Sequence, residues 1–527
     1  MTFVRFIPSN RLWLVAQKIG PLAGLLIVLA AAPAQAAPGD VGQCSAPFNI
    51  SNSPGFTSAD PFLLTDPAGM VYLFWAEKVT GEADTPPMIP DAVMVATWDG
   101  AAWSEPVDIF LSPGDMANRR IGAPQAVLDQ QGVIHLVWIG PDFTMYYSSA
   151  NAAEASSARA WRKPVLLASD QSGTQFSTAI AYEAPHTLHL AYASGSGGVA
   201  VGDKRTNRAI STLRSDDGGA TWSEPLDIFT FSDPNRGGSN VRMITGQPGQ
   251  VYATWTEWDL TGNGQVVYFA RSLDSGLTWD RPVLLDEREE LDYERDWTNL
   301  AVLDDQRLVA LWEGGFRAYP QAQYSTDGGV SWTEPIDTFY WLIADNGFAQ
   351  FVQDSAERTH VFLLRRIREG FEDKCNLFAG CTSTGAAIWH SVWEEETRWR
   401  EPAPLLFSED NYLSAAISGG NQLTLAWSAI LDPEIKVMHC QIEGAAAAAP
   451  APLPTRTPTP QPEPTVTASA GIEPAPASLP MPTAGPFEPT PPTPRDSPAI
   501  ALLYFLAPWT VVVALTLLIT RRRRLTR

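Results

Sequence analysis

The 527-residue chain is poor in the two residue types that most often bind metal ions. It contains only four cysteines and six histidines. None of them stands in an HExxH, HxxEH or CxxC pattern, the spacings with which zinc sites are commonly built. The sequence therefore predicts no metal site and no cofactor.

Acidic residues are missing from both ends of the chain. Residues 1–36 and 499–527 contain no Asp or Glu and hold three and five of the 36 basic side chains. Residues 37–498 therefore carry 28 basic and all 58 acidic groups, which gives a net charge of −30. Because such a surface repels phosphate backbones, we expect no nucleic-acid partner.

The N-terminus has the parts of a secretory signal peptide. Arg5, Arg11 and Lys18 precede an apolar run over residues 22–32, and Ala34-Gln35-Ala36 supplies the small residues of a cleavage site. We predict cleavage after Ala36, so that residues 1–36 are the signal peptide. The alternative is an uncleaved anchor helix.

A second uncharged segment lies near the C-terminus. Residues 499–520 contain 22 residues without a charge, enough to cross ~30 Å of hydrocarbon. The arginines of residues 521–527 follow directly and would keep that tail in the cytoplasm. The sequence predicts one transmembrane helix, and hence a single-pass cell-membrane protein with its bulk outside the cytoplasm.

A proline-rich segment precedes this helix. Residues 445–498 contain 17 prolines among 54 residues, mixed with Thr, Ala and Ser. Such a composition cannot bury a core and favours extended polyproline conformations. We predict a disordered stalk whose reach is at most on the order of 150 Å.

Residues 42–444 form a head in which one pattern repeats without helical periodicity. Trp-x-x-Pro recurs with its tryptophan at Trp103, Trp161, Trp222, Trp279, Trp332 and Trp399. A short strand, usually closed by an aromatic residue, ends at Trp75, Trp138, Tyr192, Trp255, Trp312, Leu363 and Trp427. Apolar strands between Gly, Asp and Pro turns predict an all-β fold. Four strands (A to D) in each repeat are typical of a β-propeller blade, so we predict seven blades.

The seventh repeat lacks a fourth strand before the stalk begins. Cys44-Ser-Ala-Pro47-Phe-Asn-Ile50 matches Trp103-Ser-Glu-Pro106-Val-Asp-Ile109, so we predict that this N-terminal segment pairs with Ile435–Cys440 and closes the ring. Cys44 and Cys440 would then be neighbours and form a disulfide, and Cys375 and Cys381 would pair within one loop. An even cysteine count fits an oxidising compartment.

Three repeats carry the same motif between their third and fourth strands. It reads Ser-x-Asp-x-Gly-x-(Thr/Ser)-Trp, with its Asp, Gly and Trp at Asp217, Gly219 and Trp222, at Asp274, Gly276 and Trp279, and at Asp327, Gly329 and Trp332. This motif resembles the Asp-box, or bacterial neuraminidase repeat, so the head resembles the sialidase-like β-propeller superfamily. We interpret the motif as a folding device. Sialidases of this family are usually six-bladed, so six blades is the alternative to seven.

The longest connections between strands predict where a site would lie. They follow strands B and D, and these B–C and D–A connections share one face of a propeller, here called the loop-rich face. Polar residues lie where the A strands begin at that face: Asp60, Arg119, Arg120, Gln175, Asn240, Arg242, Tyr293, Glu294, Arg295, Asp296, Asn346, Asp410 and Tyr412.

The resemblance to sialidases implies roles for some of these residues. A sialidase needs three arginines that clamp a carboxylate, an Asp acid/base, and a Tyr nucleophile activated by a Glu. Arg119 or Arg120, with Arg242 and Arg295, are the candidate clamp. Asp60 is the candidate acid, and Tyr293-Glu294 or Tyr412 are candidates for the nucleophile.

The same residues have a second interpretation, which is that they form a salt-bridged polar lining of the axial channel. We favour this interpretation, and with it a non-catalytic propeller that binds a glycan or protein ligand on the loop-rich face. The alternative is an exo-sialidase. Arginines converging on the axis would favour the enzyme, and arginines dispersed among acidic partners would favour the binding protein. His135, His189 and His360, which share one position in their B strands, are assigned a packing role.

Overall fold

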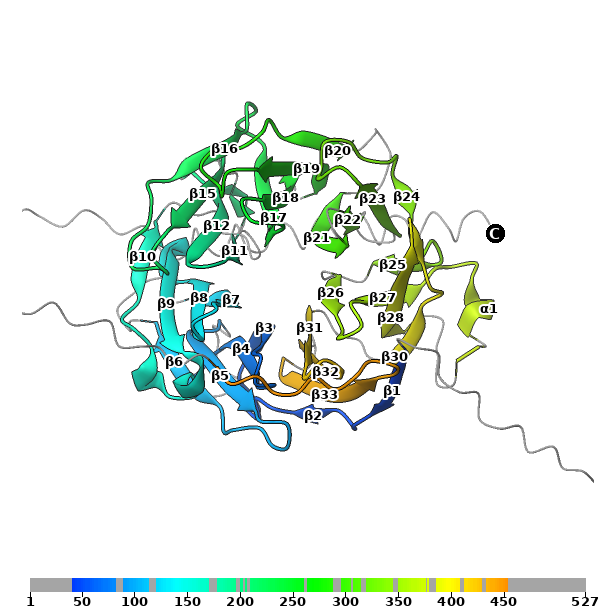
Figure 1. Cartoon of the computed structure of the whole chain (residues 1–527), viewed down its shortest axis with the longest axis horizontal. Helices are drawn as coiled ribbons and strands as arrows, with labels where there is room; N and C mark the ends of the chain where they lie inside the picture. Colours follow the sequence, from blue (N-terminus) through cyan, green and yellow to red (C-terminus); the bar gives the residue numbers. More distant parts are fainter. Residues whose placement is uncertain are drawn as a thin grey trace, which may run out of the picture. The chain divides into compact units, whose positions relative to one another are not determined.

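Seven antiparallel sheets are arranged radially around a central axis (Figure 1). The first strand of each sheet lies nearest the centre, except in the sixth sheet, where the second strand does. The computed structural model describes residues 40–81, 89–112, 120–169, 178–195, 200–201, 204–205, 209–259, 263–287, 295–304, 307–313, 319–344, 349–375, 377–378, 385–407, 412–428 and 433–453. The chain divides into two compact units, residues 1–457 and 458–527, and every described residue belongs to the first.

Blades 1 to 4 follow one another along the chain. Blade 1 contains β3 (Ser58–Thr65), β4 (Val71–Glu77), β5 (Ala92–Trp98) and β6 (Val107–Leu111). Blade 2 contains β7 (Gly122–Leu128), β8 (Val133–Ile139), β9 (Met145–Asn151) and β10 (Val165–Ala168). Blade 3 contains β11 (Thr178–Glu183), β12 (Thr187–Ser194), β15 (Ala209–Ser215) and β16 (Leu226–Thr230). Blade 4 contains β17 (Gly237–Thr245), β18 (Val251–Trp258), β19 (Gly264–Ser272) and β20 (Val283–Glu287).

Blades 5 to 7 complete the ring. Blade 5 contains β21 (Asp296–Asp304), β22 (Arg307–Glu313), β23 (Pro320–Ser325) and β24 (Ile336–Asp337). Blade 6 contains β25 (Leu342–Ala344), β26 (Gln350–Gln353), β27 (Thr359–Ile367), β28 (Ala386–Glu395), β29 (Arg398–Trp399) and β30 (Ala403–Phe407). Blade 7 contains β31 (Tyr412–Ser418), β32 (Gln422–Ser428) and β33 (Ile435–Ile442), with β1 (Val41–Cys44) and β2 (Phe48–Asn49).

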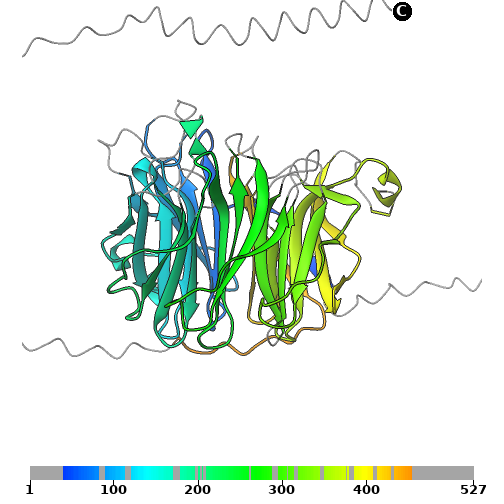
Figure 2. The ribbon, with the colours of Figure 1, turned by 90° about the horizontal axis from the view of Figure 1, so that it is seen from above.

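Smaller elements lie outside the blade sheets. They are the hairpin β13 (Ala200–Val201) and β14 (Lys204–Arg205), the helix α1 (Glu372–Cys375), and 3₁₀ segments at Pro141–Phe143, Ala152–Glu154 and Ala158–Ala160. The hairpin and α1 belong to B–C connections and extend from the same face of the ring, the upper one in Figure 2. In the described part of the chain, no helix is long and apolar enough to cross a membrane.

The N-terminal strands close the ring in blade 7. Cys44 pairs with Cys440 and Phe48 pairs with Val437, both antiparallel to β33, and Cys44 and Cys440 are joined by a disulfide. The predictions of seven blades and of a borrowed fourth strand are therefore confirmed, and the six-bladed alternative is wrong. Because the seam is paired, it presents no free edge to a second chain. Cys381 lies outside the described residues, so its bridge to Cys375 stays a prediction.

Blade 6 departs from the expected strand boundaries. Its inner strand is divided into β25 and β26, which both pair with β27. The B strand continues to Ile367, four residues beyond Leu363, where the sequence predicts that it ends. Arg365 therefore lies within the strand, and its side chain is fully buried.

The Asp-boxes connect each blade to the one before it. In the third box, hydrogen bonds from the hydroxyl and amide of Ser331 lower the pKa of Asp327 to about 2. Gly219 and Gly329 have positive φ. They lie against aromatic rings of the preceding blade, Tyr147 and Phe269, so closely that a Cβ would collide with the ring. In these boxes the Asp holds the turn by hydrogen bonds, and the Gly allows close contact with the preceding blade.

The first residues after β33 lie against the propeller. Ala448 N donates to Gly419 O (2.8 Å) and Ala451 N donates to Pro67 O (2.8 Å), which places residues 445–453 on the A–B turns of blades 7 and 1. This segment crosses the lower face in Figure 2, opposite the loop-rich face. The rest of the predicted stalk, the signal peptide, the transmembrane helix and the basic tail lie outside the described residues.

Carboxylate–histidine pairs recur beneath the A–B turns. His135 binds Asp129 (3.2 Å), His189 binds Glu183 (2.8 Å) and His360 binds Asp354 (3.2 Å). His360 Nδ1 also lies 2.9 Å from His390 Nε2. Burial, then the charges of His360 and Arg400, lower the pKa of His390 to about 3.

We expect His390 to make the protein sensitive to mild acid. The unfolded histidine protonates near pH 6.5 while the folded one stays neutral, so stability is complete above that pH and falls as the pH drops towards about 3. At pH 5 the loss from His390 is about 2 kcal/mol. The free energy of unfolding can be measured with denaturant at pH 7.5 and at pH 5. The difference between the two pH values should be about 2 kcal/mol smaller in His390→Gln than in wild type. His186→Gln, at an exposed histidine, is the control, and an unchanged difference in His390→Gln would contradict the assignment.

Candidate functional site

The seven inner strands contribute one residue each, at the same register, to a ring around the axis. Each of these residues pairs with the B-strand residue directly before the position that is usually aromatic (Trp75 in blade 1). The seven residues are Phe62, Gln125, Ala179, Arg242, Asn299, Gln350 and Ser414. All but Ala179 line an axial cavity of about 360 Å³ that also contains Asp60 and Tyr412. Arg242 is the charged member of this ring.

A β-bulge recurs just before this ring, at the loop-rich end of the inner strand. It interrupts the register of β3, β7, β17 and β21, and a residue with positive φ stands at each bulge: Asp60 (54°), Ala123 (44°), Asn240 (53°) and Trp297 (51°). Non-glycine residues rarely adopt this conformation. Bulges turn side chains out of the regular alternation, so they place Asp60 in the cavity wall.

Asp60, Arg120 and Tyr412 come together across blades 7, 1 and 2. Asp60 is buried and its Oδ2 accepts a hydrogen bond from Ala123 N (2.9 Å). Burial raises the pKa of Asp60, and the Ala123 amide and Arg120 partly oppose that rise. Burial and the charge of Asp60 also raise the pKa of Tyr412. At neutral pH the tyrosine is therefore a hydroxyl donor, and the carboxyl group takes up a proton more readily than usual.

Arg242 reaches the same cavity from blade 4. Its side chain is half-buried and Nη1 donates to Val241 O (3.0 Å). Burial lowers the pKa of Arg242 to about 9, so the guanidinium remains charged at neutral pH. It gives the cavity a positive group for an anionic ligand.

Arg295, the third candidate for a clamp, lies elsewhere. It forms an ion pair with Asp286, which also accepts a hydrogen bond from Trp312 Nε1 (3.2 Å), and it is not among the described residues that line the axial cavity. The neighbouring Asp296 accepts hydrogen bonds from Asn240 and Trp258. The structure therefore places Asp60, Arg242 and Tyr412 around one cavity and leaves Arg295 apart. Arg120 lies near Asp60 and Tyr412 but does not line the cavity. Arg119, Gln175, Tyr293, Glu294, Asn346 and Asp410 lie outside the described residues.

Several polar ring members connect neighbouring blades. Gln125 Nε2 donates to Thr178 O (2.8 Å), and Ser414 Oγ accepts from Leu63 N (2.9 Å). Asn299 donates to Ala349 O across the next pair of blades. These groups hold the inner strands together, which agrees with a partly structural role for the polar lining.

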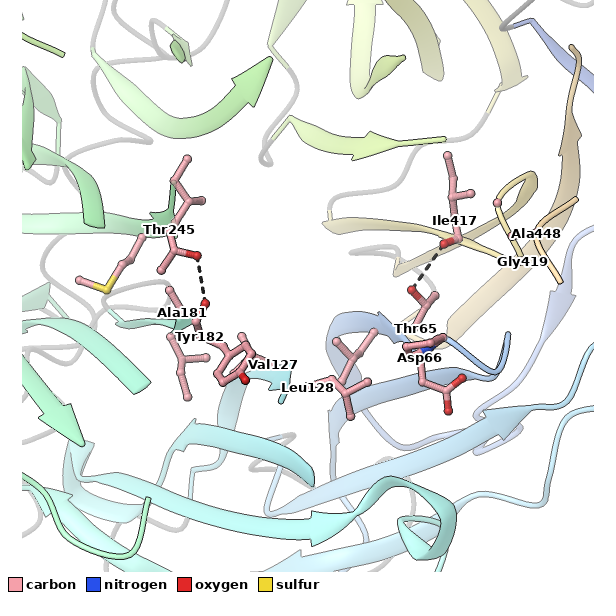
Figure 3. Close-up of a pocket in the computed structure, with 16 residues that line it drawn as sticks. Thr65, Asp66, Val127, Leu128, Ala181, Tyr182, Thr245, Ile417, Gly419 and Ala448 are labelled. Atoms are coloured by element: carbon pink, nitrogen blue, oxygen red, sulfur yellow. Dashed lines mark hydrogen bonds between the residues drawn. The ribbon is translucent and has the colours of Figure 1, made fainter. Parts of the chain in front are cut away.

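The axis changes from polar to apolar away from the loop-rich face. A second cavity, of about 700 Å³, opens between the A–B turns and is lined largely by aliphatic side chains, including Leu64, Val127 and Ile244. Figure 3 shows hydrogen bonds at its wall from Thr245 to Tyr182 O and from Thr65 to Ile417 O, with Ala448 of the C-terminal segment beside Gly419. Arg242 thus lines only the axial cavity at the loop-rich end and not this second cavity.

A buried ion pair between blades 5 and 6 was not expected. Glu313 ends β22, Arg365 lies in β27, and the two fully buried side chains form a salt bridge. Burial lowers the pKa of Arg365 to about 9. One signal could have indicated the glutamate, because acidic residues also stand at or next to the ends of other B strands, at Glu77 and Glu257. The partner arginine lies beyond Leu363, the predicted end of its strand.

Sequence and structure comparisons agree on the fold. A comparison with curated proteins finds no significant match. Among solved structures, an ulvan lyase, described as a polysaccharide lyase, is 12% identical, covering 76% of this chain and 97% of its own, with a TM-score of 0.50. A Hadza microbial sialidase is 14% identical, covering 74% of this chain and 66% of its own, with a TM-score of 0.42.

A Streptococcus pneumoniae sialidase is 11% identical, covering 78% of this chain and 71% of its own, with a TM-score of 0.40. At these identities the likeness concerns the fold alone. The model of the BNR repeat-like domain matches residues 40–330, more than half of the chain. The chain therefore belongs to the BNR repeat-like domain family and carries this domain on a seven-bladed, sialidase-like β-propeller.

Proposed function

We propose that this protein is a membrane-anchored, extracytoplasmic binding protein that takes an acidic glycan into the axial cavity of its loop-rich face and does not cleave it. The observation that carries the proposal is the position of Arg242, a charged guanidinium in the wall of the axial cavity. A guanidinium recognises a carboxylate through charge-assisted hydrogen bonds. Arg295 is engaged by Asp286, which argues against a three-arginine clamp.

Membrane anchoring through a stalk is the second part of the proposal. Residues 445–453 lie on the A–B turns of the propeller, and the proposed stalk begins after them and leads to the transmembrane helix. External protease should release the head by cutting within residues 454–498, on intact cells or on spheroplasts where an outer membrane intervenes. Recovery of the whole chain as a soluble cytoplasmic protein would contradict this topology.

An exo-glycosidase of the sialidase type is the second candidate. It is favoured by one observation, that Asp60 and Tyr412 line the same cavity as Arg242. A carboxyl group with a raised pKa suits a general acid. Under this alternative the same residues would act on the glycan as well as bind it.

A glycan array probed with the detergent-solubilised full chain tests the proposed binding. We expect wild type to bind acidic glycans and Arg242→Ala to bind them about 10- to 100-fold more weakly, since a charge-assisted contact contributes about 1.5–3 kcal/mol. Arg281→Ala is the matched control, because Arg281 is exposed in the C–D turn region of blade 4. Equal binding by Arg242→Ala and wild type, or equal binding of neutral and acidic glycans, would contradict the proposal.

A further inference from the structure

A cavity of about 410 Å³ lies between blades 3 and 4, against the Asp-box of blade 4. It shares Met243 with the axial cavity, but Arg242 does not line it. Its lining includes His189, Thr212, Arg214, Trp222 and Trp279. Its volume is within the range of small-molecule sites.

The cavity exists because one aromatic residue is replaced. One position of the C strand faces the B-strand residue that directly precedes the closing aromatic residue. In blades 2 and 4 this position is occupied by Tyr147 and Phe269. Each ring packs edge-on against the Asp-box tryptophan of the next blade, with centroids 5.2 Å and 4.9 Å apart. The register places Thr212 at this position in blade 3. Trp279 therefore lacks the ring that Trp222 and Trp332 have.

Because Thr212 stands where blade 2 has Tyr147, the histidine of blade 3 has no tyrosine hydroxyl beside it. In blade 2, Tyr147 Oη lies 2.7 Å from His135 Nδ1, while His135 Nε2 binds Asp129. His189 occupies the equivalent position in blade 3, and its Nε2 lies 2.8 Å from Glu183 Oε2. Burial lowers the pKa of His189, so the ring is neutral. A neutral imidazole that donates from Nε2 presents Nδ1 as an acceptor, and no described residue fills the place of the tyrosine hydroxyl.

The remaining polar groups of the cavity suit a polyhydroxylated ligand. Arg214 Nε is buried without a hydrogen-bond acceptor among the described residues, and Arg214 Nη2 is held by Asp216 (2.6 Å). Thr221 and Glu224 stand at the rim. The cavity thus offers an open acceptor, an open donor and a tryptophan face. A phenol could bond to the acceptor His189 Nδ1 and stack on the tryptophan. It would leave the donor Arg214 Nε and the polar residues at the rim unused.

We propose that this cavity is a second binding site, which takes a pyranose ring of a neutral saccharide. The ring would occupy the space that Tyr147 fills in blade 2, with one hydroxyl donating to His189 Nδ1 and an apolar face on Trp279. Sugar rings have both features, since C–H groups form a face and hydroxyls form the edge. The site does not depend on the ligand proposed for the axial cavity.

Saturation-transfer NMR of the full chain in detergent micelles, titrated with methyl pyranosides of glucose, galactose, mannose and N-acetylglucosamine, tests the site. We expect at least one to bind wild type, and Thr212→Tyr to weaken that binding at least tenfold because the new ring restores the packing of blade 2. Thr212→Ser, which keeps the cavity, and Arg242→Ala, which alters the axial site, should both bind as wild type does. Thr212→Tyr should also raise the Tm by a few degrees.

Thr212→Phe reproduces blade 4 and serves if Thr212→Tyr does not fold. Binding by these filled variants with wild-type affinity would overturn the proposal, as would the absence of binding of every pyranoside to wild type. Binding of p-cresol with no pyranoside bound would overturn the saccharide assignment in favour of an aromatic ligand. A loss of pyranoside binding in Arg242→Ala with none in Thr212→Tyr would place the ligand in the axial cavity.

Discussion

Replacing Glu313 by Leu should lower the free energy of unfolding by about 3–5 kcal/mol, because it leaves Arg365 charged and buried without its partner. Both side chains are fully buried and contact each other between blades 5 and 6. Removing both charges together leaves no unpaired charge in the interior. Glu313→Leu with Arg365→Met should recover most of the loss, since well-packed apolar residues often replace a buried ion pair at little cost.

Denaturant unfolding of the two single variants and the double variant measures this coupling. The surface pair Lys374–Glu401 is the matched control, because its nitrogen and oxygen are 2.6 Å apart while the side chains are 26% and 63% exposed. Glu401→Gln should cost less than about 1 kcal/mol. Additive losses in the double variant would contradict the assignment of a mutually dependent pair.

Removing the Cys44–Cys440 bridge should be the second large effect. The bridge joins residues 396 positions apart, and the chain-entropy model assigns about 6 kcal/mol to a loop of that size, although measured losses are nearer 2–5 kcal/mol. Cys44→Ser also frees β1 and β2 to separate from β33, which would expose a sheet edge. We expect a lower Tm and a greater tendency to aggregate.

The single and double cysteine variants distinguish the bridge from the two side chains. Cys44→Ser, Cys440→Ser and the double variant should lose similar stability, because each removes the same covalent bond. Losses that add in the double variant, or a loss below about 1 kcal/mol, would show that the bridge does not hold the ring closed.

The architecture could be predicted because it depends on local signals that repeat. The Trp-x-x-Pro elements mark six blades and the Asp-boxes three of them, and the match of residues 44–50 to residues 103–109 indicates the closing strand of the seventh. The position of Asp60 and Tyr412 near the axis could also be predicted, because every inner strand begins at the same face of a propeller.

The partners of charged residues could not be predicted in the same way. Arg295 and Arg242 both follow from the topology as residues near the start of an inner strand, but the ion pair between Arg295 and Asp286 has no signal in the sequence. Arg365 was missed because a buried arginine in a strand is recognisable only once Glu313 on the adjacent blade is known. Thr212 has no sequence signal of its own, and its meaning comes from comparing equivalent positions in three blades.

The central claim, that the axial cavity binds without cleaving, is tested most directly by incubating the full chain with an aryl sialoside and measuring the release of the aryl group. We predict no turnover by wild type, while acidic glycans bind in an Arg242-dependent manner. Turnover by wild type that is lost in both Arg242→Ala and Tyr412→Phe would contradict the claim and establish the exo-glycosidase.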